Sequence, residues 1–248
     1  MKTLRRILII CPFPKGVAAG QRLKYEQYFN HWRENGFEIT VSSFMDLPMW
    51  KVVYTRGNYT AKILGTLRGC LCRVVDIFRI RRFDLVYVFM WVTPLGTSFF
   101  ERLFRLLSRR LIYDIEDNVI MEKSNNINPF VRLFKSSQKT IFPIKTADHV
   151  ITSSPFLNDY TLGLNRKKAC TYISSTVDTD CFLPVNLYRN DRKVIIGWTG
   201  TFSSKVYIDL LKKVFYELSK RCEFGLRVIG NFQYELPGID LEVIQWTK

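Results

Sequence analysis

The chain has 248 residues, of which 47% are hydrophobic, and its formal net charge is +15. No apolar run reaches the roughly 18 residues that a membrane-spanning helix needs, so we expect a folded protein that does not cross a membrane. The apolar run at residues 7–11 is too short for a signal peptide and is followed by two prolines. Six cysteines without paired CxxC spacing predict reduced thiols in a cytoplasmic protein.

The order of residues 6–44 predicts a strand, a loop, a helix and a second strand. The strand RILIIC covers 6–11, the Gly- and Pro-rich loop PFPKGVAAG covers 12–20, and the helix covers 21–35 and ends at Gly36. Parallel strands joined by crossover helices form a doubly wound α/β sheet, whose ligands bind beyond the carboxyl ends of the strands. The loop lies at such an end, but it lacks the GxGxxG spacing of dinucleotide sites.

Basic residues concentrate in residues 51–110, which hold twelve Lys or Arg against three acidic residues, a local net charge of +9. Helical spacing predicts a helix over 59–80, with Lys62 and Arg73 opposite an apolar stripe of Leu64, Leu67, Leu71, Val75 and Phe78. The helix either packs this stripe on the core and exposes a basic face, or lies on an anionic membrane surface. No nucleic-acid-binding module accompanies the charge, so we expect no nucleic-acid partner.

Three carboxylates, those of Asp114, Glu116 and Asp117, follow a predicted strand at 111–113. In a doubly wound sheet this position is the ligand edge. Crowding of carboxylates raises a carboxyl pKa, which suits a general base or a group that binds an acceptor hydroxyl. The alternative is an exposed acidic turn that caps the next helix.

Residues 194–230 repeat the pattern of strand, turn, helix and strand. Gly197 and Gly200 allow a ligand close to the backbone, and the following helix start offers N–H groups to a phosphate. A plain strand-to-helix turn is the alternative.

A polar, Pro-containing connector at 174–191 predicts a domain boundary. We expect a Rossmann-like first domain at 1–180, a linker at 181–191 and an incomplete second Rossmann-like domain at 192–248. A piece of under roughly 70 residues rarely buries enough apolar area to be stable alone.

Five separated stretches carry the most specific pattern: CPFPKGVAAGQRLKYEQY at 11–28, TPLGTSFFERL at 93–103, IYDIEDNVI at 112–120, ADHVITSS at 147–154 and IGWTGTFSS at 196–204. In order and spacing they resemble family 4 glycosyltransferases of the GT-B fold. The resemblance implies a nucleotide-sugar held mainly by the second domain and a glycan or lipid-linked acceptor held by the first. It also implies retention of anomeric configuration, bacterial surface-polysaccharide synthesis, and no metal or other cofactor.

On the acceptor side, the candidate substrate-binding residues are Gly16, Gly20, Gln21, Arg22, Trp91 and Glu116, and the candidate catalytic acids are Asp114 and Asp117. Arg22 suits a phosphate or carboxylate, unless it pairs with Glu26 one turn later. Trp91 stands where some relatives carry a histidine, and it either stacks on a sugar ring or packs in the core.

On the donor side, the candidates are Gly197, Gly200, Thr201 and Lys205. Many relatives neutralise the donor diphosphate with a G-R-x(4)-K arrangement. Here Trp198 takes the arginine position, and Lys205 either serves the diphosphate or stays solvated. Relatives also carry a later pair of donor-binding glutamates that this sequence lacks. The alternative to an active transferase is therefore a non-catalytic or split subunit that a partner chain completes.

Overall fold

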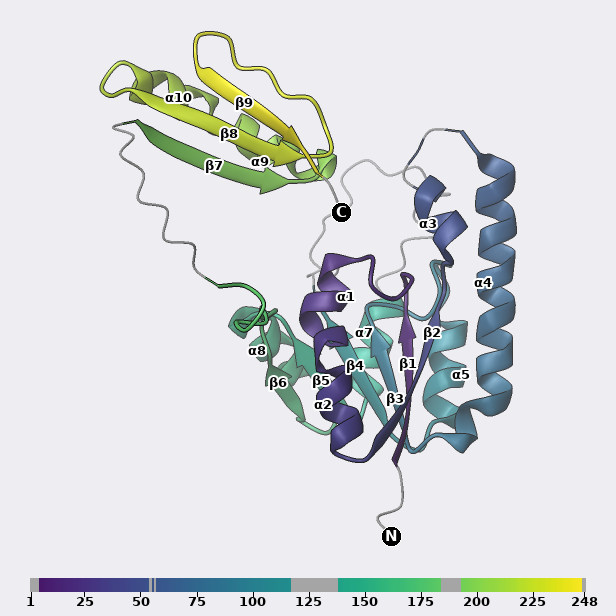
Figure 1. Cartoon of the computed structure of the whole chain (residues 1–248). Coiled ribbons are helices and arrows are strands. Elements are labelled where there is room, and N and C mark those ends of the chain that lie inside the picture. Colours follow the sequence, from purple (N-terminus) through teal and green to yellow (C-terminus); the bar gives the residue numbers. More distant parts are fainter. Residues whose placement is uncertain (1–4, 54, 56, 117–137, 184–192, 247–248) are drawn as a thin grey trace. The chain divides into compact units, whose positions relative to one another are not determined.

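The computed structural model describes residues 5–53, 55, 57–116, 138–183 and 193–246 (Figure 1). The chain divides into two compact units, residues 1–183 and 184–248, and each has its own sheet and core. The candidate residue Asp117 lies outside the described residues.

The first unit contains a six-stranded parallel sheet in the order β2-β1-β3-β4-β5-β6. Its strands are β1 (Arg5–Cys11), β2 (Phe37–Ser43), β3 (Leu85–Phe89), β4 (Leu111–Ile115), β5 (His149–Thr152) and β6 (Cys170–Tyr172). This confirms the predicted doubly wound α/β sheet. Strand order reverses at β1, so the crevice beyond the carboxyl ends of β1 and β3 is where such a sheet binds ligands.

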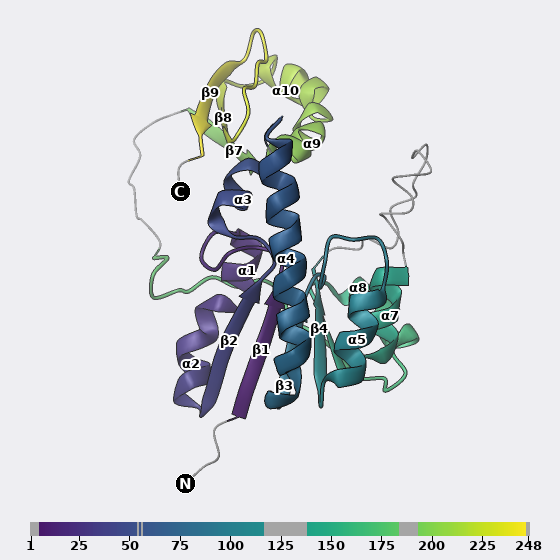
Figure 2. The ribbon, with the colours of Figure 1, turned by 90° about the vertical axis from the view of Figure 1, so that its right-hand side faces the viewer.

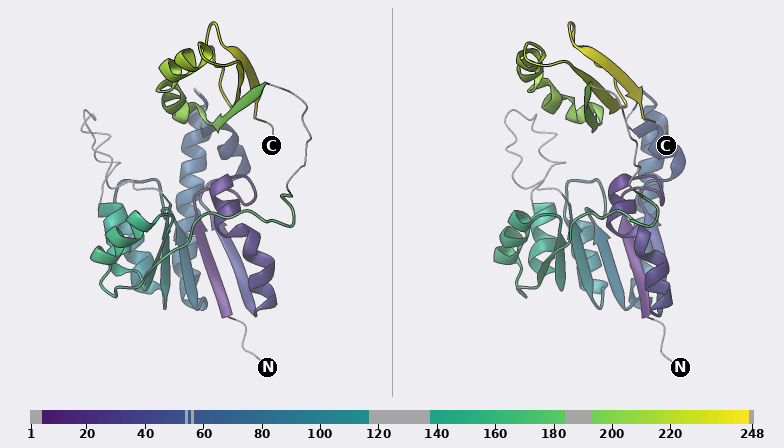
Figure 3. Two further views of the ribbon diagram at one scale, coloured as in Figure 1. Left: turned by 90° about the vertical axis from the view of Figure 1, so that its left-hand side faces the viewer. Right: turned by 60° about the vertical axis from the view of Figure 1, so that its left-hand side comes forward.

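Helices cover both faces of this sheet (Figure 3). One face carries α4 (Tyr59–Arg79), the short helix η2 (Ile80–Arg82), α5 (Phe99–Leu107), α7 (Gln138–Thr146) and α8 (Pro155–Leu164). The other face carries α1 (Ala19–Lys24), η1 (Glu26–Tyr28) and α2 (Phe29–Glu34), and α3 (Leu47–Val53) packs beside α4. Among the described residues, no helix is both long and apolar enough to cross a bilayer.

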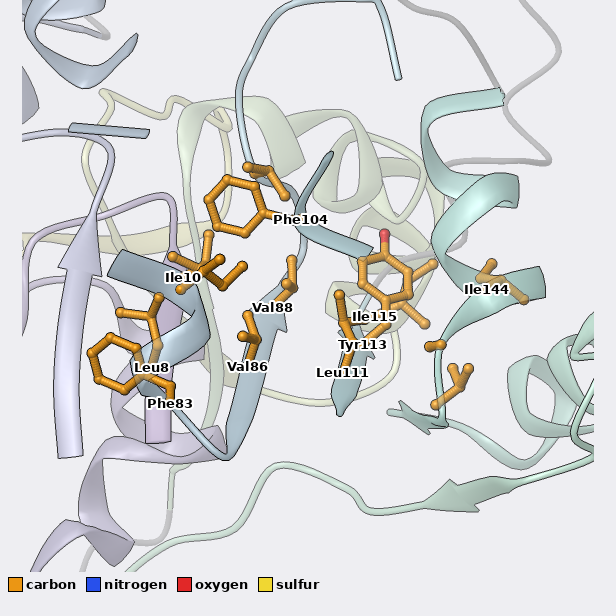
Figure 4. Close-up of a cluster of buried hydrophobic side chains, with 14 of the residues drawn as sticks. Leu8, Ile10, Phe83, Val86, Val88, Phe104, Leu111, Tyr113, Ile115 and Ile144 are labelled. Atoms are coloured by element: carbon orange, nitrogen blue, oxygen red, sulfur yellow. The ribbon is translucent and has the colours of Figure 1, made fainter. Parts of the chain in front are cut away.

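Successive residues of each strand enter two different cores, because side chains alternate across a sheet. Leu8 and Ile10 of β1 join the cluster beneath α5 and α7, where Phe104 and Ile144 meet strands β3 and β4 (Figure 4). Ile9 and its neighbours in β1 face the opposite cluster, beneath α1 and α2. The continuous apolar run of β1 therefore follows from burial on both faces.

The helix predicted at 21–35 is divided into α1, η1 and α2. Tyr25 separates the first two segments, and its buried ring packs edge-on against Tyr87 and Phe89 at centroid distances of 5.4 and 5.3 Å. Gly36 ends α2 with φ +83, and its N–H donates to Arg33 O at 3.0 Å, which confirms the predicted C-cap.

Helix α4 turns its apolar stripe away from the sheet. Arg73 and Asp76 are fully buried, whereas exposure is 56–83% for Leu64, Leu67, Leu71, Val75 and Phe78. The interpretation in which this apolar stripe packs on the core is therefore wrong. The Arg73 guanidinium donates to the carbonyls of Cys11 (2.9 Å), Ser42 (3.2 Å) and Val92 (2.7 Å), acceptors that a leucine at this position would leave unpaired.

The second unit has a three-stranded parallel sheet in the order β7-β8-β9. Its strands are β7 (Val194–Gly200), β8 (Phe224–Gly230) and β9 (Asp240–Gln245). The predicted connecting helix is divided into η3 (Phe202–Ser204), α9 (Lys205–Asp209) and α10 (Lys212–Ser219). Ile208 and Phe215 bury these helices against β8, and Phe232, Tyr234 and Leu236 of the segment before β9 complete the core.

Candidate functional site

Gln21 and Glu26 hold the loop after β1 in shape. The buried Gln21 amide accepts from Phe13 N at 3.0 Å and donates to Phe13 O at 3.1 Å. Glu26 accepts from Gln21 Nε2 at 3.2 Å and from Gly16 N at 2.9 Å. Gln21 therefore braces the loop, and Gly16, at φ +81, forms its exposed left-handed turn.

Arg22 is exposed beside the buried Gln21. An ion pair with Glu26 was the alternative to a binding role, and within the described part of the chain no such pair forms. The two Glu26 oxygens instead accept from Gly16 and Gln21. The structure thus presents the Arg22 guanidinium to solvent on α1, directly after the loop at the carboxyl end of β1.

Gly20 and Glu116 bring the starts of two loops together. A methyl group on Gly20 would lie 2.7 Å from Glu116 Oε2, so glycine permits the carboxylate to approach the backbone of α1. The Ser153 hydroxyl, which follows β5, donates to Glu116 O. Glu116 is half-buried at the carboxyl end of β4. The structure therefore groups Gly16, Gly20, Gln21, Arg22 and Glu116 at one edge of the sheet.

Asp114 lies within β4 and is fully buried, rather than beyond the strand as its sequence position suggests. The strand extends two residues past Tyr113 because Asp114 pairs in register with Phe89 of β3. Lys24 Nζ lies 3.7 Å from Asp114 Oδ1, and the Tyr87 hydroxyl donates to Asp114 Oδ2. Burial raises the pKa of Asp114 to about 6, against the lowering effect of Lys24 and Tyr87.

Lys24 and Tyr87 were not recognised from the sequence. Gln21, Lys24 and Tyr25 follow the i, i+3, i+4 spacing of a buried helix face, and all three are buried. This spacing is the feature that places Lys24 inside. Lys24 Nζ also donates to Ile173 O, so the ammonium joins α1 and β4 to the segment after β6.

We expect the Asp114 carboxyl to destabilise the first unit as pH rises from about 4 to about 6. Its folded-state pKa lies above the ordinary 3.8, so the folded state binds more protons in this window and the free energy of unfolding falls with rising pH. Urea unfolding across this range should show a steeper loss in the wild type than in Asp114→Asn. Burial also raises the pKa of Glu101, to about 7. Because Glu101 titrates in both proteins, its contribution cancels when their pH dependences are compared. If the free energy of unfolding depends on pH equally in the two proteins, Asp114 is not the group that titrates in this range.

Trp91 lies in a tight turn after β3. Met90 has φ +60, and Trp91 N donates to Phe89 O at 2.7 Å. The half-buried Trp91 ring packs edge-on against Phe44 at 5.6 Å, and Lys139 Nζ lies 5.8 Å from its centroid. A left-handed non-glycine residue at a strand end is strained, and such strain is a feature of many functional sites. Trp91 thus lies at the ligand edge with part of its ring in the core.

A second buried pair, also missed from the sequence, fastens the loop after β3. Lys139 Nζ of α7 lies 3.9 Å from Glu101 Oε1 of α5 and donates to the carbonyls of Thr93 and Leu95. The TPLG segment at 93–96 is therefore fixed to α7 beside the ligand edge.

The donor-side candidates form the turn after β7. A methyl group on Gly200 would lie 2.6 Å from Ser204 Oγ, so glycine is required there. Thr201 and Ser204 form a reciprocal capping box, with Thr201 N donating to Ser204 Oγ at 3.0 Å. Phe202 N donates to Asn231 Oδ1 at 2.7 Å. Two amides expected to meet a phosphate therefore have partners within the protein.

Lys205 follows this turn, and its Nζ lies 6.0 Å from the Phe232 ring centroid and 5.9 Å from that of Tyr234. Gly197 lies within β7, with open space beside its Cα. The turn thus supplies one cation, Lys205, and β7 supplies open backbone at Gly197. Within the described ranges of the chain, no group of three or more His, Cys, Asp or Glu could hold a metal ion.

No protein-family description and no curated protein matches this sequence. In fold, a sucrose-phosphate synthase from Thermosynechococcus elongatus aligns with 98% of this chain and 71% of its own, at a TM-score of 0.66 and 11% identity. A glycosyltransferase from Rickettsia africae aligns with 99% of this chain and 69% of its own, at a TM-score of 0.58 and 12% identity. A third structure is the catalytic domain of starch synthase IV from Arabidopsis thaliana, bound to ADP and acarbose. It aligns with 99% of this chain and 75% of its own, at a TM-score of 0.58 and 10% identity. The chain therefore shares the GT-B fold of these glycosyltransferases.

Proposed function

We propose that the protein is a family 4 type glycosyltransferase that moves a sugar from a nucleotide-sugar to a glycan or lipid-linked acceptor. The observation that supports this most is that alignments with solved structures of sugar-transferring enzymes cover 98–99% of the chain. We further propose transfer with retention, in the synthesis of bacterial surface polysaccharide. The protein would work in the cytoplasm, at the inner face of the membrane, where lipid-linked acceptors are presented.

On the acceptor side, Arg22 and Glu116 are the proposed substrate contacts. Arg22 suits a phosphate or carboxylate of the substrate because its guanidinium is exposed and has no ion-pair partner among the described residues. Glu116 accepts a hydrogen bond from an acceptor hydroxyl in this scheme, and Asp117 is kept as a second acid from its sequence position. Asp114 acts as a positioning residue, since it is buried against Lys24 and Tyr87.

On the donor side, the proposed diphosphate site is the turn after β7. Gly197 leaves open space beside the backbone of β7, Gly200 lets the Trp198 and Ser204 side chains pack against the strand end, and Lys205 supplies the positive charge. Thr201 belongs to the capping box that sets the shape of this turn. This scheme uses no metal, because the Lys205 ammonium provides the charge that faces the diphosphate.

Replacing Lys205 by Gln is expected to weaken binding of a nucleoside diphosphate about tenfold to a hundredfold, since a hydrogen bond to a charged group contributes about 1.5–3 kcal/mol. Lys213→Gln is the matched control, because Lys213 is exposed on α10, away from the turn. Calorimetric titration with UDP, GDP and ADP measures the effect. Equal affinity in the two variants would remove Lys205 from the site.

A second candidate is a subunit whose donor site is completed by a partner chain. It is favoured by exposed apolar side chains in the second unit, at 55–72% exposure for Phe202, Val206, Tyr207, Leu210 and Val214. Such a surface is typical of a protein interface. Transfer that occurs only when a chain carrying further β-α units is added would support this candidate, and transfer by the 248-residue chain alone would contradict it.

A further inference from the structure

The outward face of α4 is apolar over the whole length of the helix. Eight side chains there are 40–83% exposed: Tyr59, Ile63, Leu64, Leu67, Leu71, Val74, Val75 and Phe78. With 21 residues, the helix is about 30 Å long at 1.5 Å per residue. Near its start, Tyr59, Ile63 and Leu67 line a shallow hollow of about 260 Å³. A contiguous apolar surface of this extent marks a binding face.

The contacts of the inward face fix this orientation. Gly65 and Gly69 face Met49 and Phe44, and a methyl group at either glycine would lie 2.7–2.8 Å from those side chains. One turn further, Arg73 reaches the strand-end carbonyls. Rotating α4 to bury its leucines would break the Arg73 bonds and press larger side chains against α3 and the end of β2. The exposure is therefore a property of the fold.

The charges around the apolar face are almost all positive. Residues 59–82 contain six Lys or Arg and a single acid, Asp76, which is fully buried. Of these cations, Arg73 is buried on the inward face, Arg68 pairs with Asp46 at 2.5 Å, and Arg79 pairs with Asp76 at 2.6 Å. Arg81 and Arg82 are exposed at the end of the helix. Helix α5 packs beside α4 (Figure 2). Its Leu106 is 77% exposed. The face thus combines an apolar ridge with a basic border and exposes no acid between residues 59 and 82.

We propose that this face of α4, with the adjoining part of α5, docks on the surface of an anionic lipid bilayer. The apolar ridge enters the boundary between headgroups and acyl chains, and the basic border pairs with anionic headgroups. Exposed aliphatic side chains flanked by cations are what such an interfacial helix requires. The inference rests on the proposed function for the membrane location and adds the face of the first unit that binds the bilayer. Vesicle binding itself requires no sugar transfer.

The charge also argues against self-association through this face. Two copies meeting there would bring two positive borders together, and like charges facing each other at an interface are unfavourable. An anionic bilayer satisfies both the apolar ridge and the cations.

Flotation with two kinds of vesicle tests the proposal: phosphatidylcholine mixed with phosphatidylglycerol, and phosphatidylcholine alone. The full chain should float with the anionic vesicles only. Arg81→Gln with Arg82→Gln should weaken that binding about thirtyfold, since each cation near the surface contributes about 1 kcal/mol. Leu67→Ser with Leu71→Ser should weaken it about tenfold or more through lost insertion.

Matched controls separate these effects from general charge and hydrophobicity. Arg33→Gln with Arg166→Gln removes the same charge elsewhere on the first unit, and Phe156→Ser with Leu162→Ser removes apolar side chains of α8. Both controls should bind anionic vesicles like the wild type. All replaced residues are exposed, so unchanged circular dichroism is expected in every variant.

Three results would overturn the proposal. The first is equal binding to both kinds of vesicle, or binding to neither. The second is an equal loss of vesicle binding in the α4 variants and in the control variants. The third is a dimer in solution that Leu67→Ser with Leu71→Ser dissociates, while the protein binds no vesicles. Loss of sugar transfer with vesicle binding intact would instead count against the proposed enzyme activity alone.

Discussion

Replacing Asp76 by Asn is expected to lower the free energy of unfolding of the first unit by about 3–5 kcal/mol. Asp76 is fully buried, accepts from Ser42 Oγ at 2.6 Å, and pairs with Arg73 at 3.1 Å and Arg79 at 2.6 Å. Burial already lowers the pKa of Arg73, and Asp76 is the main group that opposes this effect. The variant therefore leaves a buried guanidinium without its counter-charge.

Urea unfolding followed by circular dichroism measures this loss. Asp159→Asn is the control, because Asp159 lies exposed on α8 and should change stability by less than about 0.5 kcal/mol. A change of that small size in Asp76→Asn would show that the Arg73–Asp76 pair does not hold α4 in its orientation.

Replacing Glu116 by Gln is expected to lower kcat for sugar transfer about a hundredfold. The carboxylate lies beside Gly20 at the carboxyl end of the sheet, where an acceptor hydroxyl would bind. Glutamine keeps the shape of the side chain but removes the charge that orients or activates this hydroxyl. Affinity for the nucleotide-sugar should stay unchanged, because the proposed role of Glu116 is on the acceptor side.

Glu34→Gln is the matched control, since Glu34 is exposed on α2 away from this edge. Steady-state kinetics of nucleotide release, with donor and acceptor varied separately, distinguish the two parameters. Unchanged kcat in Glu116→Gln, or a change confined to donor affinity, would remove Glu116 from the acceptor site.

The architecture could be predicted from the sequence because apolar runs and glycines specify it locally. The buried strand RILIIC and the C-cap at Gly36 are visible in a few residues, and the structure contains both. The interrupted helix after Gly20 could not be predicted, because Tyr25 breaks the helix where its ring meets Tyr87 and Phe89, which are about sixty residues away in sequence.

The orientation of α4 is a second feature that could not be predicted from the sequence. Periodicity identifies the apolar stripe but cannot tell which side of the helix meets the sheet. Arg73 fixes the orientation of α4 through the carbonyls of Cys11 and Ser42, near the ends of β1 and β2, and of Val92 in the loop after β3. Only the tertiary fold brings these carbonyls together. A buried arginine surrounded by carbonyls leaves no local pattern in the sequence.

The candidate site was predictable in location but not in the roles of its residues. The loop after β1 and Glu116 lie at one edge of the sheet, as parallel topology requires. Within that edge, Gln21 braces the loop, Asp114 is buried and Arg22 is exposed. Side-chain direction in β4 separates Asp114, held by Lys24, from the half-buried Glu116, and the spacing of acids alone does not reveal this difference.

Direct detection of the sugar-transfer product is the measurement that tests the central claim. The chain, alone and with a chain carrying further β-α units, is incubated with nucleotide-sugars and a bacterial lipid extract, and products are identified by mass spectrometry and NMR. We expect an acceptor enlarged by one sugar, with the donor's anomeric configuration retained and with formation dependent on Glu116 but not on Glu34. Absence of any glycosylated product and of nucleotide-sugar binding under both conditions would contradict the assignment as a glycosyltransferase.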